Sequence, residues 1–325
     1  MPFRSGGFQK IDNFIDNTVV KTLSSIINNE KNNKTTVIII TGATGSGKSK
    51  FAMQLAREID GIIINADSRQ IYKQIPIITA QPTNDEKQEI KHFLYSFQCI
   101  AETKKQYSVG NYLTDLSSTL NDIKKKYQSK VPIIVGGTML YIDSILNGIN
   151  NIPEIPTDIS SAIRDKYKNT TTDIIYNDLK KLDSKYANIV DRNNQNRIIR
   201  GIEVFTVTGK SIVDFWKASE RKQNKSIINY FNNIKKYIIS VPRDILYERI
   251  NQRFDLMIKT GAIEEAKALY DYCLSNNINI EKLPKTIGLQ ELFSYFQNKV
   301  SLHTAIEEAK QKSRNYAKRQ MTWWR

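Results

Sequence analysis

The stretch Val37–Ser49, VIIITGATGSGKS, joins a run of β-branched residues to a glycine-rich turn. Residues 37–40 predict a buried strand, and Gly42–Ser49 matches the pattern G-x-x-x-x-G-K-[ST]. The glycines let successive backbone N–H groups turn inward to bind an anion, and the helix that follows adds its positive N-terminal end. The stretch therefore predicts a phosphate-binding loop rather than a plain glycine-rich turn, and it leaves open which phosphate is bound.

The side chains of this loop have separate predicted roles. Lys48 supplies a positive charge to the outer phosphate, and the Ser49 hydroxyl can hold Mg²⁺. Phe51, Leu55 and Ile59 recur at helical spacing, so the helix after the loop should pack one apolar face on the sheet. The other predicted contacts to the phosphates are Gly42, Ala43, Thr44, Gly45, Ser46 and Gly47.

Composition excludes several classes of protein. The chain has 325 residues, of which 40% are hydrophobic, which is enough for one large domain or two smaller ones. We find no long apolar run and no secretory signal pattern, so no membrane span is expected. Cys99 and Cys273 lack the spacing of a zinc site or a disulfide framework. A reduced, cytoplasmic setting fits these observations.

The charge balance is strongly basic. Lys and Arg number 48 against 33 Asp and Glu, which gives a net charge of +15. Such an excess points to a polyanionic partner, with RNA or DNA first. A genome that favours Lys, Asn and Ile codons is the alternative explanation, and the Asn- and Ile-rich composition also fits it.

Alternating strand and helix patterns predict the fold class. Further strand signals lie at 61–66, 131–135 and 237–241, and Ser108 is placed to cap a helix between two of them. We therefore expect an α/β protein, with a P-loop NTPase-like parallel sheet flanked by helices. Residues 148–225 show helical patterns without a strong strand run. The expected organisation is an N-terminal extension outside the core (1–35), a first core half (36–147), a helical insertion (148–225) and a second core half with basic C-terminal helices (226–325).

Polar residues follow the predicted strands, at the sheet edge where α/β proteins bind ligands. Asp67 ends the second strand and could position a metal, act as a general base or simply form a turn. Thr138 follows Gly136 and Gly137, which would allow a ligand to approach the backbone closely. The alternative interpretation of residues 136–138 is an ordinary strand-to-helix turn.

Basic pairs occur on two predicted helices. Arg249 and Arg253 share one face and could close over a diphosphate opposite Lys48, although, taken alone, the pair is better explained as a solvated basic face. Arg197 and Arg200 also share a face, where they could contact nucleic-acid phosphates or water.

The C-terminal segment combines charge with aromatic rings. Lys318 and Arg319 precede Trp323 and Trp324. Basic residues beside aromatic rings suit RNA, because charge holds the backbone while rings stack on bases. The tryptophans could equally pack in the core.

Taken in order, these segments resemble the tRNA dimethylallyltransferase (tRNA isopentenyltransferase) family of the bacterial type. The resemblance covers the chain from about residue 37 to its end. The matching segments are GATGSGKS (42–49), INADSRQIYKQIPIITAQPT (64–83), YSV (107–109), VGGTMLYI (135–142), RIIRGIEVFTVTGKS (197–211), RINQRF (249–254) and YAKRQMTWWR (316–325).

The resemblance implies a prenyltransferase. Such an enzyme moves the dimethylallyl group of dimethylallyl diphosphate to N6 of the adenosine 3′ of the anticodon in tRNA (position 37 of the tRNA) and releases diphosphate. It implies that Asp67 is the general base and that Thr138 lies beside the attacked carbon or the diphosphate. It further implies that Lys48 and Arg253 neutralise the leaving diphosphate, with Mg²⁺ near Ser49.

The resemblance also implies how tRNA is held. The helical insertion would grip the anticodon stem, and the protein would act as a cytoplasmic monomer. Ser160 stands where the family commonly has an arginine, with Arg164 nearby, and Arg69 replaces a frequent apolar residue. The implied tRNA contacts are Asp67, Ser68, Arg69, Gln70, Thr138, Asn196, Arg197, Ile198, Ile199, Arg200, Lys318, Arg319 and Gln320.

Three other functions remain open from the sequence. A prenyltransferase that acts on free adenine nucleotides would share the loop and Asp67, but would need neither the insertion nor the basic tail. A P-loop kinase would transfer phosphate from ATP, with Asp67 on the metal. A nucleotide-regulated RNA-binding module would form no product.

Overall fold

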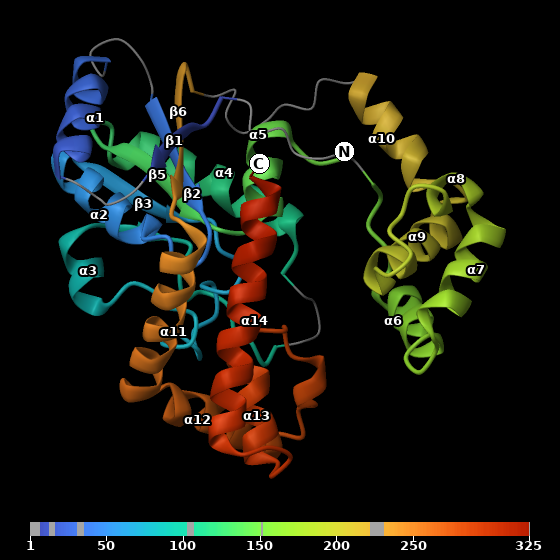
Figure 1. The fold of residues 1–325 in the computed structure, drawn as a ribbon. Helices are drawn as coiled ribbons and strands as arrows, with labels where there is room; N and C mark the ends of the chain where they lie inside the picture. Colours follow the sequence, from blue (N-terminus) through green and yellow to red (C-terminus); the bar gives the residue numbers. More distant parts are fainter. Residues whose placement is uncertain are drawn as a thin grey trace. The chain divides into compact units, whose positions relative to one another are not determined.

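A computed structural model describes residues 7–12, 17–30, 36–102, 107–150, 152–221 and 231–324. The chain divides into two compact units, one of residues 1–146 with 227–325 and one of residues 147–226 (Figure 1). The sequence placed the insertion at 148–225. None of the described helices is both long and apolar enough to cross a membrane.

The first unit is built on a parallel sheet of six described strands. The expected α/β architecture is thereby confirmed. In spatial order the strands are β1 (Gln9–Asp12), β6 (Asn233–Ser240), β2 (Thr36–Gly42), β5 (Val131–Gly136), β3 (Gly61–Asn65) and β4 (His92–Phe93). Strand β2 is buried along its whole length, as its β-branched run predicted.

Helices cover both faces of this sheet (Figure 1). Because side chains alternate along a strand, Ile38 and Ile40 of β2 pack with α2 (Lys48–Ile59), whereas Val37 and Ile39 pack with α4 (Val109–Lys126) and α5 (Met139–Asn147). Ser108 caps α4, because its hydroxyl accepts the N–H of Asn111 at 3.2 Å. A short helix, α3 (Asn84–Glu89), precedes β4.

The N-terminal segment corrects the sequence-based expectation. Residues 1–35 were expected outside the core, but β1 pairs with β6, and α1 (Asn17–Glu30) packs on α2. Val20, Leu23 and Ile27 are buried there. The expectation is wrong for the described part of this segment because the pairing partner of β1 lies near the other end of the chain, where no local pattern reveals it.

Four helices follow β6. They are α11 (Arg243–Lys259), α12 (Ala262–Ser275), α13 (Leu289–Phe296) and α14 (Leu302–Trp323). Figure 1 shows α14 alongside α11. Polar contacts hold the pair together, since Lys310 contacts Asp255 at 2.7 Å and Arg314 donates to Asn251 at 2.6 Å. One residue of each helix, Arg253 of α11 and Gln320 of α14, contacts the loop that follows β2.

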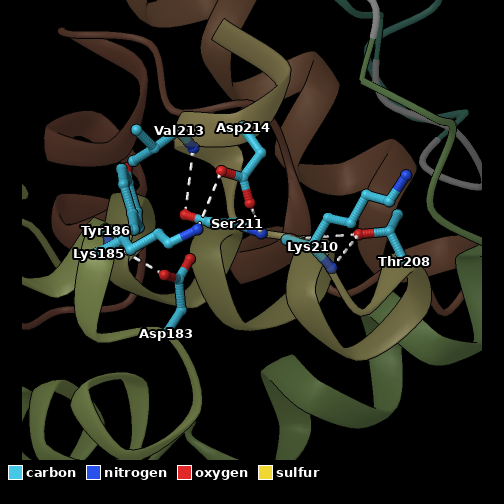
Figure 2. Close-up of polar contacts among 8 residues, drawn as sticks. All are labelled: Asp183, Lys185, Tyr186, Thr208, Lys210, Ser211, Val213 and Asp214. Carbon is cyan, nitrogen blue, oxygen red and sulfur yellow. Dashed lines mark hydrogen bonds and ion pairs between the residues drawn. The ribbon is translucent and has the colours of Figure 1, made fainter. Parts of the chain in front are cut away.

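The second unit is helical and has its own apolar core. Polar contacts set the start of two of its helices (Figure 2). Asp183 accepts the Tyr186 N–H at 3.0 Å, and the Ser211 hydroxyl accepts the Val213 N–H at 3.2 Å. The helices are α6 (Thr157–Lys166), α7 (Thr172–Leu182), α8 (Ser184–Ala187), α9 (Gln195–Thr208) and α10 (Ile212–Arg221).

Candidate active site

The phosphate-binding loop connects β2 to α2 in the expected way. Gly47 precedes α2 with φ at 88°, a left-handed conformation that favours glycine. The Ser46 N–H closes the turn on the Ala43 carbonyl at 3.1 Å. The Lys48 amino group folds back over the loop and donates to the same carbonyl at 3.4 Å. The loop thus has the shape of an anion cradle, and Ser49 stands exposed at its rim.

Thr44 ties this loop to two helices from the far end of the chain. Its hydroxyl accepts a hydrogen bond from Arg253 of α11 at 2.6 Å. Its backbone N–H donates to the Gln320 side chain of α14 at 2.8 Å. The amide nitrogen of Gln320 then donates to the Gly137 carbonyl at 2.7 Å. A side chain at Gly137 has no room, because its Cβ would lie 2.5 Å from that nitrogen.

Asp67 is held at the carboxyl end of β3 by the buried side chain of Asn65. The Asn65 amide accepts the Asp67 N–H at 2.8 Å and donates to the Asp67 carbonyl at 2.9 Å. The Asp67 carboxylate itself accepts the Arg69 N–H at 2.9 Å. The next residue, Ser68, donates its N–H to the Thr138 hydroxyl at 2.9 Å. Asp67 and Thr138 are therefore fixed on adjacent loops.

The charges at this edge act on one another. Burial lowers the pKa of Lys48 to about 8, a shift that the Asp67 carboxylate opposes and the Arg253 charge reinforces. Burial also lowers the pKa of Arg253, again opposed by Asp67. Four cationic side chains (Lys48, Lys50, Arg249 and Arg253) and two carboxylates (Asp67 and Glu86) line the site, which therefore has a surplus of positive charge for an anionic ligand.

These groups line one cleft. It has a volume of about 350 Å³ and is lined by Lys48, Ser49, Asp67, Arg249 and Arg253 among others. Apolar side chains form another part of the wall, contributed by Met53, Ile63, Val135 and Tyr95. The cleft can therefore hold a molecule with a polyanionic end and an apolar end.

Asp67 affects the ionisation of three tyrosines. Burial, together with the charge of Asp67, raises the pKa of Tyr95, Tyr141 and Tyr316. The pKa of Tyr316 rises to about 12. Tyr141 is buried and its ring stacks on that of Tyr112, with ring centroids 4.0 Å apart, whereas Tyr316 is only half-buried.

The structure gathers Lys48, Ser49, Asp67, Thr138 and Arg253 at one edge of the sheet, as the sequence indicated. Two positioning residues were missed, Asn65 at the end of its strand and the bridging role of Gln320. The position of an asparagine two residues before Asp67 was a sequence signal for the first of these roles, and we found none for the second.

Some predicted tRNA contacts need correction. The side chains of Ile198, Ile199 and Gln320 are buried, so they have almost no surface for an RNA. The two isoleucines face the apolar core of the helical unit, and Trp324 packs in the core of the first unit. Asn196, Arg197, Lys318 and Arg319 are exposed. Arg325 lies outside the described residues.

Gln70 uses its side chain within the protein. Its amide nitrogen donates to the carbonyls of Thr79 and Ala80 at 3.0 and 2.7 Å. Ser68 and Arg69 are half-buried beside it. Gln70 therefore stabilises the conformation of the loop that follows it.

The fold and the site define a P-loop protein whose anion cradle faces a carboxylate and an apolar wall. The sequence model of the family described as IPP transferase matches residues 70–325. The chain belongs to this family of prenyltransferases.

Curated relatives agree over most of the chain. The chain is 39% identical to the tRNA dimethylallyltransferase of Ehrlichia canis over 292 residues, covering 89% of this chain and 91% of the relative. It is 37% identical to the tRNA dimethylallyltransferase of Pelagibacter ubique over 289 residues, covering 89% of this chain and 88% of that one.

Solved structures show the same fold. A eukaryotic dimethylallyltransferase acting on tRNA superposes with a TM-score of 0.70 at 30% identity, covering 89% of this chain and 69% of that one. The tRNA isopentenylpyrophosphate transferase of Bacillus halodurans superposes with a TM-score of 0.57 at 29% identity, covering 89% and 86%.

Proposed function

We propose that this protein transfers the dimethylallyl group of dimethylallyl diphosphate to N6 of an adenosine in tRNA, and that the target is the adenosine 3′ of the anticodon. The observation that carries the proposal is that Asp67 lines the same cleft as Lys48 and Arg253. The general base must be negatively charged, whereas the leaving diphosphate needs positive charge around it. A carboxylate beside an anion-binding loop supplies both in one cleft.

The cradle serves the leaving group. As the bond from N6 to the allylic carbon forms, the bond from that carbon to the diphosphate oxygen breaks, and its electron pair stays with the diphosphate. Lys48, Arg253 and the loop N–H groups stabilise the charge that develops there. The apolar wall around Met53 and Ile63 suits the five-carbon group.

The carboxylate serves the nucleophile. The lone pair of the adenosine N6 is delocalised into the purine ring, so the nitrogen attacks weakly unless its proton is removed. Asp67 accepts that proton as the new bond forms, which contributes about 10²–10⁴-fold to the rate. The adenosine must leave its stack to reach Asp67, and the half-buried Tyr316 offers a ring near the carboxylate.

Mg²⁺ fits the donor set around the loop. The exposed Ser49 hydroxyl lies in the cleft beside Lys48. The described residues contain no group of three or more His, Cys, Asp or Glu side chains that could hold a metal ion by themselves. Substrate phosphates and water would therefore supply most of the oxygen ligands, as is usual for Mg²⁺. When bound, the ion would neutralise charge on the departing diphosphate.

Polar and basic residues of two helices are assigned to tRNA. Asn196, Arg197 and Arg200 of α9, together with Lys318 and Arg319 of α14, would contact RNA phosphates. The helical unit would hold the anticodon stem. A monomer working in the cytoplasm completes the proposal.

A single assay tests this function. Purified protein is incubated with Mg²⁺ and dimethylallyl diphosphate labelled in the allylic group, with unmodified tRNA transcript or AMP as acceptor. Label is expected in tRNA, and an adenosine-to-guanosine change next to the anticodon should abolish it. Label in AMP alone would support the free-nucleotide enzyme instead, whereas label in neither acceptor would overturn both. Phosphate transfer from [γ-³²P]ATP would identify a kinase.

A further inference from the structure

The helical unit contains a carboxylate that two arginines share. Glu203 of α9 is 1% exposed. One of its oxygens accepts the Ser160 hydroxyl at 2.8 Å and lies 2.9 Å from Nε of Arg164. Its other oxygen lies 3.4 Å from Nη1 of Arg200, one turn earlier on the same helix. Arginines from α6 and α9 thus meet at one buried charge.

The two guanidinium groups remain largely open to solvent. The side chain of Arg164 is 47% exposed and that of Arg200 is 41% exposed. A guanidinium has five N–H donors in a rigid plane. Nε of Arg164 and Nη1 of Arg200 contact Glu203, which leaves further donors on each group for a ligand. Glu203 thus holds both guanidinium groups from their buried side.

Physical chemistry explains why this arrangement holds. A buried carboxylate is strongly destabilising unless it is paired, so Glu203 favours conformations that keep both arginines beside it. In return the arginines lose much of the side-chain freedom that a free surface arginine has. Phosphate recognition by arginine depends on a planar, two-point geometry, and donors already held in place lose less entropy on binding.

We propose that Glu203 is a positioning residue that presents Arg164 and Arg200 as a preformed pair to backbone phosphates of the tRNA. Arg197 is exposed one turn before Arg200 and extends the same basic surface. The inference rests on the proposed function for its ligand. It adds Arg164 as a phosphate contact and gives a buried acidic residue a role in binding a polyanion.

The decisive test is Glu203→Gln, because simple charge counting and the proposal predict opposite results. Removing a negative charge from a basic surface should strengthen RNA binding if charge alone mattered. We expect affinity for unmodified tRNA transcript to fall several-fold instead, because a neutral amide cannot hold two guanidinium groups. The KM for tRNA should rise while kcat at saturating tRNA stays within about twofold.

Arg164→Ala removes the proposed phosphate contact itself and leaves Glu203 paired with Arg200 and Ser160. Affinity should fall about tenfold, and the slope of log Kd against log salt should decrease by about one. Lys181→Ala is the matched control, since Lys181 is 81% exposed on α7 and should change affinity by less than about twofold. Glu203→Gln and Arg164→Ala should combine less than additively, because each disrupts the same pair.

A rescue variant separates positioning from folding. Ser160 lies one turn before Arg164 on α6 and already contacts Glu203. The double variant Ser160→Arg/Arg164→Ala should therefore recover most of the lost affinity. Circular dichroism and the thermal midpoint monitor folding throughout.

Unchanged or tighter tRNA binding by a folded Glu203→Gln protein would overturn the inference. So would an unchanged salt slope in Arg164→Ala, which needs no assumption about the buried site. In either case prenyl transfer by the wild-type protein would leave the proposed function standing. A wild-type protein that binds no tRNA would overturn both.

Discussion

The side-chain oxygen of Gln320 accepts the backbone N–H of Thr44 at 2.8 Å, so the last helix holds the phosphate-binding loop directly. The same amide donates to the Gly137 carbonyl, and the loop that carries Thr138 is fixed with it. One side chain therefore sets the spacing between the diphosphate cradle and the loop beside Asp67. The Thr44 N–H is used in this bridge and turns away from the nest.

Gln320→Glu should impair transfer more than it impairs folding. The new carboxylate keeps an acceptor for Thr44 but turns an oxygen toward the Gly137 carbonyl, which leaves that group without a donor. Loss of about 1–3 kcal/mol at this junction would lower kcat/KM for dimethylallyl diphosphate by about tenfold or more. Gln311→Glu, an exposed position on the same helix, is the control. Equal activity of the two variants would show that the bridge is dispensable.

Binding of dimethylallyl diphosphate should weaken as pH rises through about 8. Burial lowers the pKa of Lys48 to about 8, so the amine is charged below that pH and becomes neutral above it, whereas an ordinary lysine stays charged until about 10.4. Calorimetry across this range measures the affinity, and buffers of different ionisation enthalpy should reveal proton uptake on binding near pH 8. Lys48→Arg should remove the pH dependence. A flat profile for the wild-type protein would contradict the assignment.

Asp67→Asn should abolish most turnover while tRNA remains bound. The amide preserves the acceptor for the Arg69 N–H but cannot take the N6 proton, so kcat should fall by about 10²–10⁴-fold. Single-turnover transfer and filter binding of tRNA measure the two effects separately. Turnover near the wild-type rate would remove Asp67 as the base.

Arg253→Ala should act mainly on the diphosphate. The change removes a charge from the cleft and a hydrogen bond to the Thr44 hydroxyl, and a hydrogen bond to a charged group contributes about 1.5–3 kcal/mol. We expect the Kd for dimethylallyl diphosphate to rise at least tenfold, with tRNA affinity little changed. Lys259 is exposed at the end of the same helix, and Lys259→Ala should leave both affinities unchanged. A larger loss of tRNA affinity than of diphosphate affinity would indicate that Arg253 contacts RNA rather than the diphosphate.

Two neighbouring isoleucines test the role of the N-terminal helix. Ile27 is fully buried against the core, whereas Ile26 is 43% exposed. Ile27→Ala should lower the free energy of unfolding by about 2–5 kcal/mol, and Ile26→Ala should change it by less than about 0.5 kcal/mol. Urea denaturation compares the two. Equal stability would mean that α1 packs only loosely.

The phosphate-binding loop and its flanking elements were predictable because their signals are local. A β-branched run, glycines at fixed spacing and an apolar helical stripe all lie within a few residues of Lys48. Ser108 is a similar case, since its capping bond reaches only to Asn111. The sheet class followed from the alternation of such segments.

Contacts between distant segments were not predictable in this way. Gln320 bonds to residues in two loops far from it in sequence, and β1 pairs with a strand near the other end of the chain. Hydrophobic periodicity along the sequence carries no information about such distant partners. The burial of Ile198 and Ile199 was open to prediction from helical periodicity, but the resemblance placed the whole segment on the RNA.

The strand order has a consequence for synthesis of the protein. Strand β6 lies between β1 and β2, yet it is translated after the helical unit. On the ribosome, β2 therefore cannot pair with β6 until most of the chain has been synthesised. The hydrogen bond between Gln320 and Thr44 forms later still, after residue 320 has been added. A nascent chain that ends before residue 320 lacks this bridge, so the loop after β2 is tied to the C-terminal helix only at the last stage of synthesis.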